Sequence, residues 1–169
     1  MKSRTGGAMA KVINFNPGKN VKAGIFEKYM KDNDLNFFQR RDTYDEKDSV
    51  AFITAIPAGS HRLVAAVITD NSMYTLLRIH LGVAPAGPAR KTFIRFLEQL
   101  NAAHSIFKYS IAEDDNTFLD ICVTTRPESF DPEVIRTSLN LIIFHLKDNY
   151  EDIARRLSKP GDASDGFEL

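Results

Sequence analysis

The sequence predicts an α+β fold in which helices pack on a twisted antiparallel sheet. Four apolar, strand-like runs between residues 35 and 81 are joined by short connections rich in turn-forming residues, and such connections favour antiparallel neighbours. Apolar residues at helical spacing come before these runs, after them and again at the end of the chain. The expected order of elements is therefore α-β(3-4)-α-β-β-α.

The length of 169 residues fits one domain with a substantial core. We expect a flexible N-terminal arm over residues 1–19, a single α+β domain over residues 20–157 and a disordered tail over residues 158–169. The charge is unevenly placed, because residues 1–41 hold nine Lys and Arg against three Asp and Glu, whereas residues 112–169 hold six against thirteen.

The first helix is expected over residues 21–32, where Asn20 is a suitable N-cap. Its apolar side chains follow helical spacing and are Val21, Ile25, Phe26, Tyr29 and Met30. Strands are then expected at Leu35–Arg41, Ser49–Ile56, Arg62–Thr69 and Met73–Leu81. The second and third runs are apolar on both faces, so we expect helices to cover one face and a further element or a second subunit to cover the other.

A second helix is expected over residues 89–103, with Pro88 suited to its first turn. Strands at residues 106–111 and 117–125 follow, and a long helix over residues 132–157 begins after the cap-and-proline pair Asp131-Pro132. The first half of this helix is apolar on two faces, which predicts burial on more than one side and hence a homodimer. The expected dimer contacts are Phe93, Phe96, Leu141 and Phe144.

No pattern in the sequence indicates catalysis, a metal or a cofactor. The four histidines are scattered and Cys122 is the only cysteine, so no metal-ligand spacing arises. The loop Gly82–Gly87 differs from a phosphate-binding loop because its prolines lack the N–H groups that would face phosphate. The acidic residues Glu113–Asn116 are interpreted as a solvated hairpin turn. A lone cysteine, together with no apolar run long enough to span a membrane, favours a cytoplasmic protein.

Two other classes of function are compatible with the sequence. A regulatory protein could associate with nucleic acid through its basic N-terminal part, with Phe37-Phe38 and Arg40-Arg41 stacking on bases and holding phosphate. The sequence pI of about 6.9 argues against such a surface as the main role. An unrecognised enzyme would depend on Cys122 or on one of the histidines.

The stretch FIRFLEQLNAAHSIFKYSI, followed by FLDICV and by the helix after FDPEVI, resembles the YbjN-like family and the wider fold of type III secretion chaperones. Leu100-Asn101, Phe107, the turn at Glu113–Asn116 and Leu119 follow that layout. The resemblance implies a dimeric, non-catalytic, bacterial binding module. Secretion chaperones are distinctly acidic, whereas this chain is neutral overall with a basic front.

The leading prediction is therefore a chaperone-like or regulatory module that binds a protein partner on an apolar groove or sheet edge. Ile25, Phe26, Tyr29 and Met30 on the first helix are the predicted partner-binding residues. Packing of the same side chains in an ordinary core is the alternative for each of them.

Overall fold

The computed structural model describes residues 20–43 and 45–164, and it confirms the α+β class with an antiparallel sheet and packed helices. The helices are α1 (Val21–Asp32), α2 (Pro88–Ala103), a 3-10 turn η1 (Pro127–Ser129) and α3 (Pro132–Ala154). The strands are β1 (Gln39–Asp42), β2 (Val50–Ala58), β3 (His61–Thr69), β4 (Tyr74–Val83), β5 (Lys108–Ile111), β6 (Asn116–Thr124) and β7 (Lys159–Pro160). The expected element order is found, with η1 and β7 as additions.

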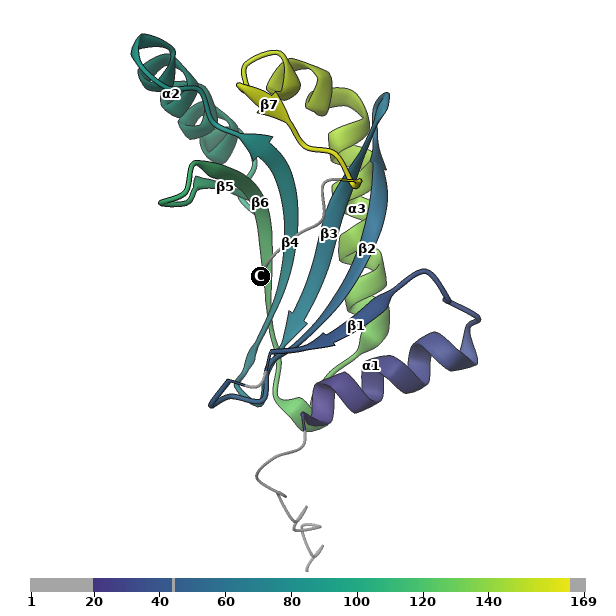
Figure 1. Cartoon of the computed structure of the whole chain (residues 1–169). Coiled ribbons are helices and arrows are strands. Elements are labelled where there is room, and N and C mark those ends of the chain that lie inside the picture. The colour runs from purple at the N-terminus through teal and green to yellow at the C-terminus, as the bar shows by residue number, and fades with distance from the viewer. Residues whose placement is uncertain (1–19, 44, 165–169) are drawn as a thin grey trace, which may run out of the picture.

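The strands lie in the order β1-β2-β3-β4-β6-β5, all neighbours are antiparallel, and β7 pairs with the end of β4. Figure 1 shows α3 running along one side of the sheet, α1 beside its lower end, and α2 at the far end close to β5. Among the helices described, none is both long enough and apolar enough to cross a lipid bilayer.

The helices α1 and α3 both begin with a side-chain cap, and the cap of α1 also bonds to the sheet. The Asn20 side chain accepts a hydrogen bond from the Ala23 N–H, as expected of an N-cap, and its amide donates to the Thr69 carbonyl on β3 at 2.9 Å. Asp131 accepts from the Glu133 N–H, and Pro132 occupies the first turn of α3. The cap of α1 therefore also fixes this helix to the sheet.

The core lies between α1, α3 and the facing side of the sheet. From α3 it takes Ile135, Leu139, Ile142, Leu146 and Tyr150, all buried. Their 4-3-4-4 spacing keeps one stripe of the helix against the strands. The opposite side of the sheet holds the two-pronged Arg78–Asp120 ion pair, with nitrogen–oxygen distances of 2.8 and 2.9 Å. Cover of this second face by another element or subunit stays a prediction.

The segment that follows Leu157 differs from the expected disordered tail. Residues 158–164 lie along the sheet, where Ser158 N–H bonds to the Val83 carbonyl and Gly161 N–H to the Leu81 carbonyl, both at 2.9 Å. The Tyr150 hydroxyl links β4 to this segment, because it donates to the Leu81 carbonyl and accepts from Gly161 N–H. We call residues 158–164 the strap. Sequence reasoning missed it because a two-residue strand has no periodicity to recognise. Residues 165–169 and the expected arm at 1–19 lie outside the described residues.

The first expected strand is shorter than Leu35–Arg41. The chain leaves α1 through Asp34, whose φ is +54°, and Leu35 N–H bonds back to the Met30 carbonyl, so residues 35–38 form a turn. The apolar Leu35, Phe37 and Phe38 gave this turn the composition of a strand.

The strap depends on Gly82, which has φ of +130° at an irregularity in the β4–β6 pairing. A Cβ at this position would lie 2.7 Å from the backbone nitrogen of Gly161. We expect Gly82→Ala to lower the free energy of unfolding by about 2–4 kcal/mol through strain and lost strap contacts. Gly24→Ala, at an open site in α1, should instead stabilise by about 1 kcal/mol. Thermal unfolding of both variants checks this, and equal midpoints would contradict it.

Candidate partner-binding groove

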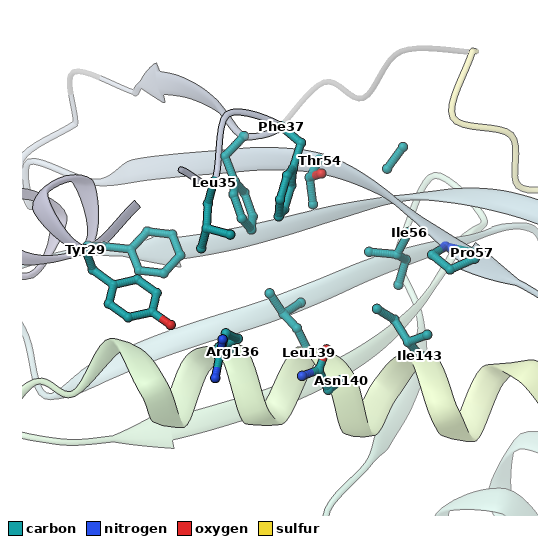
Figure 2. A pocket seen from close by; sticks show the side chains of 13 residues that line it. Tyr29, Leu35, Phe37, Thr54, Ile56, Pro57, Arg136, Leu139, Asn140 and Ile143 are labelled. Atoms are coloured by element: carbon teal, nitrogen blue, oxygen red, sulfur yellow. The ribbon is translucent and has the colours of Figure 1, made fainter. Parts of the chain in front are cut away.

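An open apolar groove of about 370 Å3 lies between α1, the turn after it, β2 and α3. Figure 2 shows Leu35 and Phe37 descending from the turn towards Leu139 on α3, with Ile56 and Pro57 at the β2 end. Its lining is Phe26, Tyr29, Leu35, Phe37, Phe38, Thr54, Ala55, Ile56, Pro57, Arg136, Leu139, Asn140 and Ile143. We call this the β2 groove.

The aromatic wall of the β2 groove is built on a buried anchor. Phe26 is 2% exposed, and its ring meets Phe52 edge-on at 5.0 Å and Phe38 at 5.6 Å between centroids. Phe37 packs on Phe38 at 5.0 Å yet stays 59% exposed. The wall therefore runs from the buried ring of Phe26 through Phe38 to the exposed ring of Phe37. Phe37 presents a large apolar surface that the described residues leave uncovered.

Half of the outer edge of β2 has no strand partner among the described residues. β1 pairs with β2 only from Asp42 opposite Val50 to Gln39 opposite Ile53, and the chain then turns away. Thr43 N–H bonds to the Ser49 carbonyl. In an antiparallel pair, alternate residues point their backbone groups to the same neighbour. Residues 49, 51, 53 and 55 of the chain thus face the β1 side, and at Ala55 that side is vacant.

The even-numbered residues of β2 face β3, as the hairpin confirms. Ala58 pairs with His61 across the two-residue turn Gly59-Ser60, which places residue 58 in a hydrogen-bonded pair with β3. The Ala55 N–H, the Ala55 carbonyl and the Pro57 carbonyl consequently point outward. The Arg62 guanidinium reaches the Ala55 carbonyl at 3.4 Å, a long contact.

A second hollow lies at the same edge on the opposite face of the sheet. It measures about 280 Å3 and is lined by Phe37, Gln39, Arg41, Ile53, Thr54, Ala55, Val64 and Ala163. Phe37, Thr54 and Ala55 line both hollows. The free half-edge of β2 is therefore flanked by one hollow on each face.

Two polar residues that line the β2 groove, Tyr29 and Arg136, both bond to Glu133. Glu133 receives the Tyr29 hydroxyl at 2.8 Å and the Arg136 Nε at 3.0 Å. Partial burial and this bond to a carboxylate both raise the pKa of the Tyr29 hydroxyl, so it remains a donor at neutral pH. Arg40 contacts Glu27 and Asp42, and its bond to Asp42 lowers the pKa of that carboxyl.

The predicted partner-binding residues divide between groove and core. Phe26 and Tyr29 line the β2 groove, whereas Ile25 packs half-buried against the core and Met30 is buried in it. Of the predicted dimer contacts, Phe93 is buried, and Phe96 is half-buried beneath the Arg156 guanidinium, 4.2 Å from its ring centre. Leu141 and Phe144 are 42% and 68% exposed.

Sequence reasoning missed the groove's contributions from β2, α3 and the turn. The sequence places the Phe37-Phe38 pair in the expected strand Leu35–Arg41, where alternation would put the two rings on opposite faces, whereas the structure places both residues in the turn. In a turn the two rings can lie on the same side, and both of them line the β2 groove. The spacing of residues 139, 140 and 143 does not mark them as a groove wall. In the sequence, apolar residues on the flank of a buried helix look the same as residues that face the core.

Within the described residues, Cys122 does not lie with His104 or His145. Cys122 is exposed and pairs in register with Leu76 on the outer face, while His104 and His145 contact each other on the helix side. Within residues 20–43 and 45–164, no group of three or more His, Cys, Asp or Glu could hold a metal ion. Arg40 is engaged by two carboxylates, and four of the nine basic residues of the N-terminal part lie outside the described residues.

Comparison with known proteins gives a limited result. No protein-family model and no curated protein match the sequence, so the resemblance to the YbjN-like family stays a prediction. Among solved structures, the chain is similar to one from the heterodimeric ExoU-SpcU complex of the type III secretion system of Pseudomonas aeruginosa. Sequence identity is 19%, the match covers 63% of this chain and 83% of that chain, and the TM-score is 0.42. Function is therefore inferred from the geometry of the chain itself.

Truncating the two ends of the aromatic wall should separate the binding surface from the core. We expect Phe26→Ala to cost about 3–5 kcal/mol, because a large ring leaves a cavity in the core. Phe37→Ala should change stability by only about 0.5 kcal/mol, since the ring is mostly exposed. Chemical denaturation measures both values. A large loss for Phe37→Ala would show that this ring belongs to the core.

Proposed function

We propose that the chain is a non-catalytic, chaperone-like protein-binding module that takes an extended partner segment along the free half-edge of β2. One observation carries this proposal: Ala55 points an N–H and a carbonyl outward at the place where two hollows flank the edge. Backbone pairing to a sheet edge provides affinity, and pockets for alternate side chains provide selectivity.

The direction of β2 sets how the partner's side chains are distributed. A residue that exchanges two hydrogen bonds with Ala55 directs its side chain to the same face as Ala55, into the smaller hollow. The residues before and after it face the opposite way, into the β2 groove beside Leu139 and Ile143. The partner segment is thus extended, with large apolar residues alternating with small or polar ones.

The two hollows favour different side chains. The β2 groove is mainly apolar, with rings from α1 and the turn on one wall and aliphatic side chains from α3 on the other. The smaller hollow includes the polar side chains of Gln39 and Arg41. A helical partner would leave the outward N–H of Ala55 unused, because all its own backbone groups are bonded internally.

We further propose that the module is a cytoplasmic homodimer joined through α2. The inward face of α2 carries Phe93, so its outward face would meet the second copy, and there Ile94 is 39% exposed. Around Ile94 lie Arg90, Lys91, Arg95 and Glu98. Two α2 helices crossing antiparallel about Ile94 would place Glu98 of each copy against Arg90 and Lys91 of the other, which is self-complementary. The exposed free thiol of Cys122 suits a reducing compartment.

Strand addition at β2 is tested with Ala55→Pro, which removes the outward N–H. Proline is tolerated on a sheet edge where no ladder bond is lost, so the thermal midpoint should change little. We expect a nine-residue fluorescent peptide of alternating Leu and Thr or Asp to bind the wild type. Its affinity for Ala55→Pro should fall by about three- to tenfold, as one backbone hydrogen bond is lost. Fluorescence polarisation measures both affinities.

Two controls decide the outcome of that experiment. A peptide of the same composition with its apolar residues in one block should bind at least about tenfold more weakly, since only alternation fills both hollows. Phe144→Ala, an exposed apolar residue outside both hollows, should bind like the wild type. Equal binding of the two peptides, or unchanged binding by Ala55→Pro, would remove the strand-addition proposal.

The dimer is tested with Ile94→Asp, examined by light scattering across a range of concentrations. A buried carboxylate at the centre of the α2 pair would cost several kcal/mol, so this variant should be monomeric. Phe144→Asp should leave the dimer intact. A monomeric wild type would refute the dimer, and dissociation by Phe144→Asp alone would move the contact to α3.

A further inference from the structure

A cluster of four rings joins α3 to the end of the sheet that holds α2 and β5. The His145 imidazole of α3 lies 4.3 Å from Phe107 and 4.5 Å from His104, measured between ring centroids. Its Nε2 lies 2.5 Å from the Tyr109 hydroxyl oxygen. His145, Phe107 and Tyr109 are each less than 9% exposed. None of these contacts belongs to the β2 groove.

The α2–β5 unit is held together independently of this cluster. The Asn101 side chain on α2 bonds to both backbone groups of Tyr109, accepting from its N–H at 2.7 Å and donating to its carbonyl at 3.0 Å. α2 and β5 can therefore move together once the edge ladder that pairs Lys108–Ile111 of β5 with residues 117–120 of β6 opens as well. Figure 1 shows them standing at the far end of the sheet, beside the upper part of α3. The ring cluster and the Arg156–Phe96 contact bridge this unit to α3 and the residues after it.

The charged and titratable groups around His145 come from three elements. His104 approaches from the C-cap of α2 and Tyr109 from β5. On α3 itself, Asn149 bonds to the His145 carbonyl at 2.7 Å, while Lys147 and Asp148 are exposed to solvent. No carboxylate bonds to the imidazole among the described residues. A proton on His145 would therefore sit beside the second imidazole, His104, without a counter-ion.

We propose that this ring cluster is an acid-sensitive latch, which holds the α2–β5 unit against α3 while His145 is neutral and releases it when His145 is protonated. In the closed state, burial and the nearby His104 lower the pKa of His145 to about 4. In the released state the ring is hydrated, and its pKa returns to about 6.5. The released state thus binds a proton more readily, so falling pH favours it.

The direction and range of the effect follow from these two values. Above pH 6.5 neither state is protonated, and the latch has its full strength. Between pH 6.5 and 4 the equilibrium constant for release rises by up to about tenfold per pH unit, about 300-fold in total. Below pH 4 both states carry the proton, and the effect no longer grows.

Hydrogen–deuterium exchange of the full chain tests the latch between pH 7 and 4.5, after correction for the intrinsic pH dependence of exchange. We expect protection of residues 104–111 and of the neighbouring part of α2 to fall about tenfold per pH unit below 6.5, while β2 and β3 stay protected. His145→Gln keeps a hydrogen-bonding side chain beside Tyr109 but does not titrate, so its protection should be independent of pH. His80→Gln, a histidine on β4 bonded to Asn116, should behave like the wild type.

Two outcomes would overturn the proposal. One is an acid response of His145→Gln equal to that of the wild type, and the other is uniform loss of protection over the whole sheet. If His145→Gln does not fold, the wild type alone decides by histidine NMR. An apparent pKa of His145 above about 4 and below about 6, with exchange broadening confined to residues 104–111, supports the latch, because release on protonation raises the value above that of the closed state. An apparent pKa of about 4 without such broadening, or one of about 6 or above, refutes it.

Discussion

The packing of α3 across β2 and β4 is the constraint on which the other features depend. The buried stripe that contains Ile135, Ile142 and Leu146 fixes the rotation of this helix against the sheet. Once that rotation is set, each flank of the helix has a fixed direction. Arg136 and Ile143 lie on one flank and complete the β2 groove, Ile143 beside Ile56 and Pro57. His145 faces the opposite way and completes the ring cluster with Phe107 and Tyr109.

Where β1 ends is the second determinant, and it is set by the chain between α1 and β1. Asp34 adopts a left-handed conformation, and Leu35 bonds back to Met30, so residues 35–38 are used in a turn and β1 retains only four residues. β2 has nine residues. The difference in length leaves the half-edge at Ala55 vacant, and the same turn places Phe37 and Phe38 beside it. The open edge and its apolar wall thus have one cause.

The sequence predicted features that rest on periodicity and capping. The α1 bounds and the Asn20 and Asp131 caps follow from helical spacing and local hydrogen bonding, and all are found. The groove was only half predictable, because Phe26 and Tyr29 lie on a recognisable helix face, whereas Ile56 and Ile143 become groove residues through contacts distant in sequence. The strap at Gly161 depends on the irregularity at Gly82, which leaves no pattern in the sequence.

The two flanks of α3 are separated by a well-packed core, and this bears on whether they communicate. Coupling between two sites requires an element that has two arrangements to which both sites respond. Release of the α2–β5 unit breaks ring contacts to His145, but it leaves the contacts of Ile142 and Leu146 with β2 and β4 in place. Because the groove is lined by β2 and α3, whose packing this release leaves in place, acid release and peptide binding should be nearly additive, as independent sites are. Coupling would arise only if α3 turned about its own axis, and that rotation would expose much of its buried apolar stripe to solvent.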